Sequence, residues 1–374
     1  MQTNFQLKQH NTLKIFQALQ TRESLSRKEL ACITKLSWGS VSAITNELIS
    51  KNLVIAKKEN SAGGRPAELL ALNPERFLRL GIDINSVGLT FVIVNLQGKA
   101  VYSNTVCLIS HKKEGILSQL FMETENLLKT WNEVLDISLS MQGKINRKEG
   151  VSVRANFSLD WVNVPIVSLF ESRFHLPTYL YHDPDCLLYY HYRNDARLQN
   201  KQDGFVIRLD NGIGMAHLLY GKLYVAPDDG AYEFGQTIAV PNGRACSFGK
   251  NGCLEAYSSI RGMREVYALQ HNDDFIEKLQ EKDSDALAIL KQATDLLGVS
   301  IANLFILSAP QFILLDGILL NLIPDCFENI LSSIEKYTNE PCNLLCARYQ
   351  KDAPAVGACL ITLENTTERL LFDL

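Results

Sequence analysis

The front of the chain carries apolar residues at helical spacing. Residues 4–20 have a broad apolar stripe and are predicted to form a helix. Ser26 and Glu29 have the spacing of a capping box, in which the hydroxyl and the carboxylate satisfy the first amides of a helix. A second helix is therefore expected to run from there to about Thr34.

A third helix is predicted to begin after Ser37, its expected N-cap. A strand-like run at 53–55 follows this helix. Two short helices joined by a tight turn, with a strand after them, are typical of a winged helix-turn-helix. The inward face of the third helix carries Val41, Ile44, Leu48 and Ile49.

From residue 80 onward the pattern changes to short apolar strands in two similar blocks. Each block has an aspartate that closes its first strand, Asp83 or Asp210, and a Gly-Lys turn before its third strand. This weak repeat predicts two related lobes, each with a β-meander, and a ligand cleft between them. Strands and helices interleave, so the predicted fold class is α/β. The predicted strands are 80–84, 89–95, 100–108, 205–210, 214–220 and 222–225, and the predicted helices are 112–132, 163–175, 184–198, 284–308 and 353–371.

The longest apolar stretch, 301–323, is interrupted by polar residues and would bury Asp316 in a bilayer. We therefore expect a buried helix, a turn and a strand there, in a soluble chain that does not enter a membrane. Nine cysteines are scattered along the sequence, and the first twenty residues do not have the pattern of a secretory leader. These features predict a location in a reducing cytoplasm.

The formal net charge of the 374-residue chain is only −4, but the charge is unevenly distributed. Residues 1–76 contain eleven Lys and Arg against six Glu, a net charge of +5, which leaves −9 on the remainder. A basic front segment is typical of a part that binds a polyanion. The alternative is an uneven surface charge without functional meaning.

The outward face of the third predicted helix is expected to present short hydroxylated side chains near its N-terminus. Such side chains suit hydrogen bonds to phosphates and base edges in the major groove. Residues 57–66 form a candidate wing, in which Arg65 follows two glycines. The alternative is a three-helix interaction module whose basic residues are only solvated. The candidate DNA-binding residues are Arg27, Ser37, Trp38, Ser40, Ser42, Thr45 and Arg65.

These motifs resemble the DNA-binding head of regulators in the ROK family, whose name covers repressors, open reading frames and sugar kinases. The resemblance lies in Leu-Ser-Arg-x-x-Leu-Ala at 25–31 and Gly-Gly-Arg-Pro-Ala at 63–67, and it extends over the rear of the chain. It implies an N-terminal winged helix-turn-helix followed by an actin-like, two-lobed ROK domain of the ribonuclease H-like type. The implied boundaries are 1–76 for the head and 77–374 for the ROK domain, with lobe I at about 77–185 plus the C-terminal helix 353–374 and lobe II at about 186–352.

The kinases of this family cradle ATP phosphates with glycine-rich turns, and three of those turns are altered here. Asn85 and Ser86 stand where the first turn has two glycines. The turn at 210–214 gains an aspartate, and the strand at 310–318 ends in a single glycine beside another aspartate. A carboxylate beside a polyphosphate is repulsive. The resemblance therefore implies a domain that does not bind ATP and is not an enzyme.

The residues that hold the sugar in ROK proteins are largely retained. Asp183 matches the aspartate that acts as general base in the kinases; the alternative is that it only caps the helix that begins at Pro184. His182 stands where asparagine is usual, and Gln236 stands where histidine is usual. By resemblance, the candidate ligand-binding residues are Gly143, Asn156, His182, Asp183, Glu233, Gln236 and Glu255.

The zinc motif of the family is degenerate in this sequence. Cys246 and Cys253 are kept, but Gln236 replaces the histidine ligand and Phe248 replaces the middle cysteine. Two thiolates do not complete the four-coordinate site that zinc prefers, so we expect no zinc and no other cofactor. Whether the two thiols pair or bind another ion stays open.

The sequence thus predicts a transcriptional regulator, a repressor of carbohydrate-use genes, whose degenerate kinase cleft binds a sugar or sugar derivative. The expected partners are double-stranded operator DNA and further copies of this chain in a homodimer or homotetramer, because one recognition helix makes too few base contacts. The first alternative is a ROK sugar kinase with an accessory DNA-binding head. The second is a regulator whose cleft binds a protein or a phosphosugar.

Overall fold

The computed structural model divides the chain into two compact units. Unit 1 comprises Met1–Tyr181 and Ala355–Leu374, and unit 2 comprises His182–Pro354. Unit 1 therefore contains both the front segment and most of the expected lobe I. The structure describes residues 4–59, 67–155, 157–226, 232–246, 249–271, 273–323 and 325–372.

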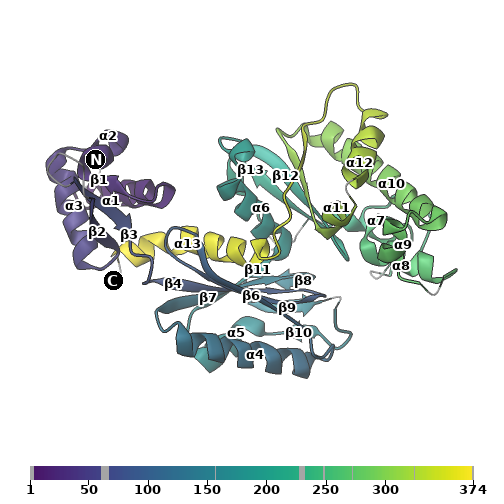
Figure 1. Cartoon of the computed structure of the whole chain (residues 1–374), viewed down its shortest axis with the longest axis horizontal. Coiled ribbons are helices and arrows are strands. Elements are labelled where there is room, and N and C mark those ends of the chain that lie inside the picture. Colours follow the sequence, from purple (N-terminus) through teal and green to yellow (C-terminus); the bar gives the residue numbers. More distant parts are fainter. Residues whose placement is uncertain are drawn as a thin grey trace. The chain divides into compact units, whose positions relative to one another are not determined.

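The head, which is the part of unit 1 up to Leu72, has three helices and a small sheet (Figure 1). Ser26 forms the predicted capping box: its hydroxyl accepts from the Glu29 amide at 3.2 Å, and its amide donates to the Glu29 carboxylate at 2.8 Å. A helix pair followed by antiparallel strands confirms the winged helix-turn-helix. The helices are α1 (Asn4–Thr21), α2 (Arg27–Thr34) and α3 (Trp38–Ser50), and the strand order is β1 (Leu25–Ser26), β3 (Ala67–Leu72), β2 (Val54–Glu59).

Lobe I, the rest of unit 1, has a mixed five-stranded sheet at its centre (Figure 1). Its first three strands form the predicted antiparallel meander, and a fourth pairs in parallel with the first. The order is β11 (Thr178–His182), β7 (Val134–Met141), β4 (Leu78–Ile84), β5 (Gly88–Val94), β6 (Ala100–Cys107). A smaller sheet has the order β10 (Val162–Val164), β9 (Val151–Arg154), β8 (Lys144–Asn146).

The two faces of the larger sheet are covered by different helices, because successive side chains of a strand point to opposite faces. Leu80 and Ile82 of β4 share an apolar cluster with residues of α4 (Lys113–Thr130) and α5 (Ile166–Phe174). Gly81 faces the other side, where a Cβ would lie only 2.4 Å from the Ala355 carbonyl. Glycine at this position therefore lets helix α13 (Ala353–Phe372) pack directly on the strand.

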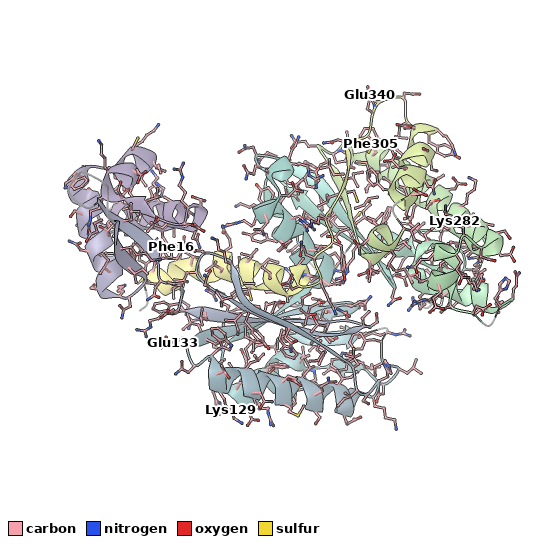
Figure 2. The ribbon with its side chains drawn as sticks, in the orientation of Figure 1. Phe16, Lys129, Glu133, Lys282, Phe305 and Glu340 are labelled. Atoms are coloured by element: carbon pink, nitrogen blue, oxygen red, sulfur yellow. The ribbon has the colours of Figure 1, made fainter. Side chains whose placement is uncertain are left out.

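The head and lobe I share an apolar core through α13. Leu370 and Leu371 of this helix are buried in the same cluster as Phe16 of α1, which Figure 2 labels. The Lys51 ammonium at the end of α3 also donates to the Leu371 carbonyl at 2.8 Å. The C-terminal helix therefore completes the core of a domain that begins at the opposite end of the chain.

Unit 2 repeats the strand order of lobe I. Its first three strands form an antiparallel meander, a fourth pairs in parallel with the first, and a fifth pairs in parallel with the fourth. The internal repeat predicted from the sequence is therefore confirmed as two sheets of the same topology. The order is β14 (Lys222–Leu223), β13 (Ile213–Leu219), β12 (Asp203–Leu209), β15 (Ile313–Asp316), β16 (Leu344–Cys346).

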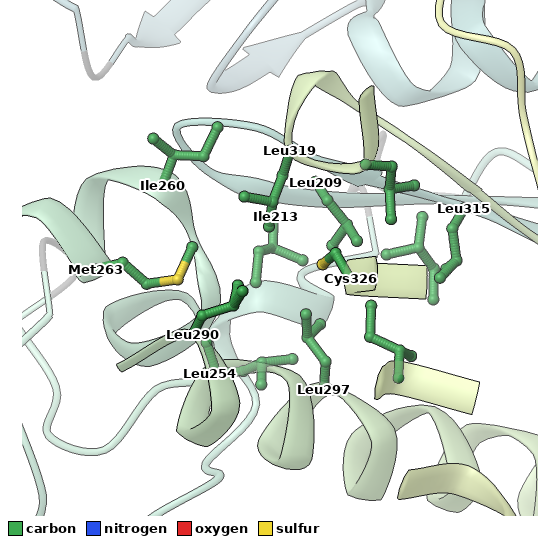
Figure 3. Packing of buried hydrophobic residues seen from close by; sticks show 14 of the residues in the cluster. Leu209, Ile213, Leu254, Ile260, Met263, Leu290, Leu297, Leu315, Leu319 and Cys326 are labelled. Carbon is green, nitrogen blue, oxygen red and sulfur yellow. The ribbon is translucent and has the colours of Figure 1, made fainter. Parts of the chain in front are cut away.

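Helices cover both faces of the unit 2 sheet. One face packs against α6 (Asp183–Asn194) through Leu187 and Leu188. On the other face, Leu209 and Ile213 meet side chains such as Leu297 of α10 (Figure 3). By length and composition α10 could cross a membrane, but Leu290, Leu297 and Ile301 contribute to this core. The sequence predicted a buried helix from residue 301 onward, whereas Ile306 and Leu307 at the end of α10 are exposed. The helices on this side are α7 (Glu255–Ser258), α8 (Ile260–Ala268), α9 (Phe275–Gln280), α10 (Ser284–Ser308), α11 (Ile318–Leu322) and α12 (Asp325–Glu335).

Candidate functional site

The first turn of α3 forms an exposed polar surface on the head. The Ser37 hydroxyl accepts from the Ser40 amide at 3.2 Å and lies 2.9 Å from the Ser40 hydroxyl. The Trp38 side chain is 59% exposed, and Ser42 is half-buried. Hydroxyls and an exposed indole thus surround a helix N-terminus, the kind of surface that contacts a phosphate backbone.

Thr45 is not part of this surface, which corrects the prediction that it faces outward. It is fully buried and donates to the Val41 carbonyl at 2.8 Å. Positions 41, 44, 45 and 48 are the buried positions of α3, so Thr45 falls on its inward stripe. A hydroxyl that bonds to its own helix backbone satisfies its polar group without solvent.

Arg27, another predicted DNA contact, is engaged within the head. Its guanidinium donates to the Thr45 hydroxyl at 3.1 Å and to the Asn46 side chain at 2.9 Å, and it forms an ion pair with Glu68. These contacts join α2, α3 and β3. Arg65 and the rest of the predicted glycine-containing wing tip lie outside the described residues.

In lobe I, the turn after β4 has its amides occupied by side chains. Asn85 accepts from the amides of Val87 and Gly88 at 2.8 and 3.2 Å, and Gln142 accepts from the amide of Ser86 at 3.2 Å. Three consecutive amides of this turn, which could otherwise bind an anion, therefore donate to the protein's own amide side chains.

Gly143, the residue after Gln142, occupies a position that only glycine fits. Its φ is +102°, and a Cβ would lie 2.3 Å from the Arg154 carbonyl. Gly143 belongs to unit 1, whereas the other described ligand candidates belong to unit 2. Asn156 lies outside the described residues.

In unit 2, an arginine engages the predicted base. Asp183 is the first residue of α6, is only 4% exposed, and accepts from Arg208 Nη1 at 2.8 Å. Arg208 Nε also donates to Asp210 at 2.7 Å, and Asp210 accepts from the Ile318 amide at 2.9 Å. Arg208 therefore links Asp183 to the altered turn at 210–214. Arg208 is not among the residues predicted from the sequence, although a lone charge within the apolar strand 205–209 was a usable signal.

The protonation of Asp183 is set by its surroundings. Burial raises the pKa of Asp183 to about 6; Arg208 opposes this shift and Asp210 adds to it. The preceding residue, His182, has its Nε2 3.7 Å from the nearer Asp183 carboxylate oxygen. Asp183 therefore changes between donor and acceptor close to neutral pH.

Two further carboxylates of the same unit, Glu255 and Glu233, influence each other. Glu255 is 6% exposed and accepts from the Ile213 amide at 3.1 Å and from Arg261 at 2.6 Å. Burial raises the pKa of Glu255, Ile213 and Arg261 oppose the shift, and the nearby Glu233 raises it further. Glu233 is exposed and accepts from the Gln236 side chain at 2.7 Å. Unit 2 thus brings Glu233, Gln236 and Glu255 close together, and all three are ligand residues predicted from the sequence.

Asp316, the carboxylate expected to repel a polyphosphate, is engaged inside unit 2. It is 2% exposed and lies 2.5 Å from His191 Nε2 of α6. Gly317, which follows it, has a φ of +142°, and a Cβ there would lie 2.1 Å from the Leu209 carbonyl. The glycine is therefore required by close backbone packing.

The two cysteines of the degenerate zinc motif are in contact. Cys246 Sγ lies 2.6 Å from Cys253 Sγ, whereas two thiolates on one tetrahedral zinc, at about 2.3 Å each, lie about 3.8 Å apart. Gln236 is bound to Glu233 and Lys250. Within the described residues, no group of three or more His, Cys, Asp and Glu side chains is arranged to hold a metal. Neither the donors nor their spacing fits a zinc site.

Comparisons with known proteins relate this chain to one protein family. The sequence model of the ROK family matches residues 79–365. The xylose repressor of Caldicellulosiruptor bescii is 25% identical over 83% of this chain and 84% of that protein. The DNA-binding transcriptional repressor Mlc of Escherichia coli is 24% identical over 79% of this chain and 75% of that protein.

Solved structures show the same fold. A ROK family transcriptional regulator, a homologue of the E. coli Mlc protein, superposes with a TM-score of 0.77 at 21% identity and covers 98% of each chain. A ROK glucokinase from Streptomyces griseus in complex with glucose and AMPPNP gives a TM-score of 0.66 at 21% identity, over 75% of this chain and 97% of that chain. A kinase thus matches almost in full while leaving a quarter of this chain unmatched. With a winged helix-turn-helix joined to an actin-like domain, and a family match that spans most of its length, the chain belongs to the ROK family.

Proposed function

We propose that the protein is a DNA-binding transcriptional repressor of carbohydrate-use genes, located in the cytoplasm, with a sugar or sugar derivative as its effector. The observation that carries this proposal is a winged helix-turn-helix in the same chain as a ROK domain. Relatives that match over most of their length are named xylose repressor and DNA-binding transcriptional repressor.

Operator DNA binds at the first turn of α3 in this proposal. Trp38 and the serines at 37, 40 and 42 supply the contacts, supported by the exposure of this turn. Arg27 acts as a positioning residue, because its guanidinium is committed to contacts that join α2, α3 and β3. Two heads in a homodimer or homotetramer read a pseudo-palindromic operator, since one recognition helix makes too few base contacts.

The effector is held by Asp183, Glu233, Gln236 and Glu255. Arg208 and Arg261 fix two of these carboxylates in place, and fixed carboxylates accept hydrogen bonds from polyol hydroxyls at little ordering cost. His182, which precedes Asp183 in unit 2, is proposed to contribute to the site.

We also propose that the domain transfers no phosphoryl group and binds neither zinc nor another cofactor. A general base has to take up a proton, whereas the Arg208 guanidinium, 2.8 Å from the Asp183 carboxylate, stabilises the charged form and opposes that step. The Asn85 side chain takes two of the amides of the first turn. Both contacts support ligand binding without turnover.

The decisive experiment is operator selection from random DNA, followed by titration of the complex with pentoses, hexoses and N-acetylhexosamines. At least one sugar is expected to change operator affinity. Trp38→Ala should lose DNA binding and keep the thermal shift given by that sugar, whereas Asp183→Asn should keep DNA binding and lose the sugar response. Failure to enrich any sequence, or a complex insensitive to every sugar, would argue against the proposal.

A second candidate function is sugar kinase activity, favoured by one observation. The pKa of about 6 for Asp183 suits a general base near neutral pH. An assay of ADP release with ATP, magnesium and the same sugars separates the two functions. ADP formation that is lost in Asp183→Asn would reclassify the protein as an enzyme.

A further inference from the structure

The contact between Cys246 and Cys253 involves none of the candidate DNA-binding or sugar-binding residues themselves. Backbone bonds close the segment between them: the Cys246 amide donates to the Lys250 carbonyl at 2.8 Å, and the Gly249 amide donates to the Cys246 carbonyl at 3.0 Å. Cys253 pairs with Ile238 in an isolated bridge. The local backbone therefore holds the two cysteines together.

The spacing of the sulfurs distinguishes between two uses of a cysteine pair. A shared tetrahedral zinc would hold them about 3.8 Å apart, farther than the observed 2.6 Å. A disulfide needs about 2.05 Å, which the pair reaches by a shift of well under 1 Å. The geometry thus favours a bond between the sulfurs over a shared metal.

We propose that Cys246 and Cys253 form a reversible disulfide, a site of oxidation that occupies the place of the family's zinc motif. The oxidant is hydrogen peroxide. Formation of the bond is independent of the proposed function, and only its effect on sugar binding rests on that function.

The two cysteines differ in burial, so they take different steps in the formation of the disulfide. Cys246 is half-buried, so its thiolate attacks the peroxide, the O–O bond breaks, and a sulfenic acid and one water form. Cys253 is fully buried, and its sulfur then displaces the hydroxyl of the sulfenic acid as a second water. Two thiols and one hydrogen peroxide thus give one disulfide and two waters.

The bond would act on the candidate sugar residues through short connections. Cys253 lies two residues before Glu255, and Lys250, between the cysteines, donates to Gln236 at 3.3 Å. The disulfide adds a covalent link to the backbone bonds that already join these cysteines and so restrains Glu255 and Gln236 further. Oxidation is therefore expected to tighten sugar binding by about threefold to tenfold.

The test uses the reduced full-length protein, treated with stoichiometric hydrogen peroxide, alkylated and digested. We expect a peptide cross-linked between Cys246 and Cys253, which dithiothreitol separates. Cys253→Ser should leave a Cys246 sulfenic acid that dimedone traps, and Cys107→Ser, at an exposed cysteine, should leave the cross-link intact. Full alkylation of both cysteines after peroxide, or zinc that copurifies and disappears in Cys246→Ser, would overturn the proposal.

Binding of the sugar identified in the operator titration is then compared in the oxidised and reduced proteins. A lower Kd on oxidation supports the link to the effector, and an equal Kd contradicts that link while the cross-link itself stands. The mass measurement needs no sugar, so failure of the disulfide and failure of the sugar proposal are distinguishable.

Discussion

At the residue scale, Arg208 determines what Asp183 can do. The guanidinium stabilises the ionised carboxylate, but burial disfavours that form more strongly, so the pKa of Asp183 stays above its ordinary value of 3.8. A carboxylate in this position is held in one orientation. The ion pair with Arg208 opposes the uptake of a proton, which a general base requires, and leaves the carboxylate able to accept a hydrogen bond from a hydroxyl.

Sugar binding is therefore expected to weaken at acid pH. Asp183 is ionised above pH 6 and gains a proton below it, so affinity should fall by up to about tenfold per pH unit below 6 if the sugar needs the ionised form. Calorimetric titration between pH 5 and 8 measures this. Asp183→Asn should bind weakly with a flatter pH profile, and a pH-independent affinity of the unsubstituted protein would exclude Asp183 from the site.

Two substitutions in the head distinguish a residue that contacts DNA from a residue that only positions the helices of the head. Trp38→Ala should weaken operator binding at least about tenfold while the free energy of unfolding changes by no more than about 0.5 kcal/mol, because the side chain is largely exposed. Arg27→Ala should reduce both operator affinity and the free energy of unfolding, since it removes contacts that join three elements. Fluorescence anisotropy and urea unfolding provide the two readouts, and Trp38→Ala with unchanged DNA affinity would remove α3 from the interface.

Residue roles could be predicted from the sequence where a local pattern defines them. The capping box of Ser26 and Glu29 is such a pattern, because both partners lie within one helical turn. Thr45 was misplaced because a threonine on the inward stripe satisfies its hydroxyl on the backbone, which polarity alone does not reveal. The Arg208–Asp183 pair joins residues 25 positions apart, and only the packing of α6 on β12 brings them together.

At the scale of elements, α13 is the component that two parts of unit 1 share. Its first turn packs on Gly81 of lobe I, and its last turn lies in the core of the head. Leu371→Ala should lower the free energy of unfolding by about 2–5 kcal/mol and weaken DNA binding, because it opens a cavity in the head core. Glu368→Ala, an exposed change on the same helix, is the control. Equal effects of the two changes would contradict the shared core.

A buried ion pair lies under the same helix. Arg79 is 1% exposed, pairs with Asp136 and donates to Thr366 of α13 at 2.8 Å. Asp136→Ala should cost about 3–5 kcal/mol because it leaves the guanidinium unpaired in the interior. The double change Arg79→Met with Asp136→Leu should recover most of that loss in urea unfolding. An unchanged free energy of unfolding in Asp136→Ala would show that the pair is not buried in solution.

The sequence predicted elements well where they are long or regularly patterned. The two meanders and α10 appear close to their expected bounds. Strands β8, β9 and β10 have three or four residues each, too few to show alternation, and were not foreseen. The contribution of α13 to the head core was also not foreseen, because no local pattern identifies which core a helix will enter.

At the scale of the whole molecule, the chain crosses between its two units twice, after Tyr181 and after Pro354. In the proposed function, a sugar can change operator affinity only if it binds two arrangements of the molecule with different affinity. Linkage then requires operator DNA to change sugar affinity by the same factor. Measuring both factors on one preparation tests this requirement directly.

The proposed sugar is finally expected to shift the distance between the units. Fluorophores on non-canonical residues at Lys129 in unit 1 and Lys282 in unit 2, both exposed and labelled in Figure 2, report this distance by energy transfer. A pair at Lys282 and Glu340, both within unit 2, should remain unchanged, and Asp183→Asn should abolish the shift of the first pair. Operator release by the sugar without any change between Lys129 and Lys282 would place the regulated movement inside unit 1, where α13 joins lobe I to the head.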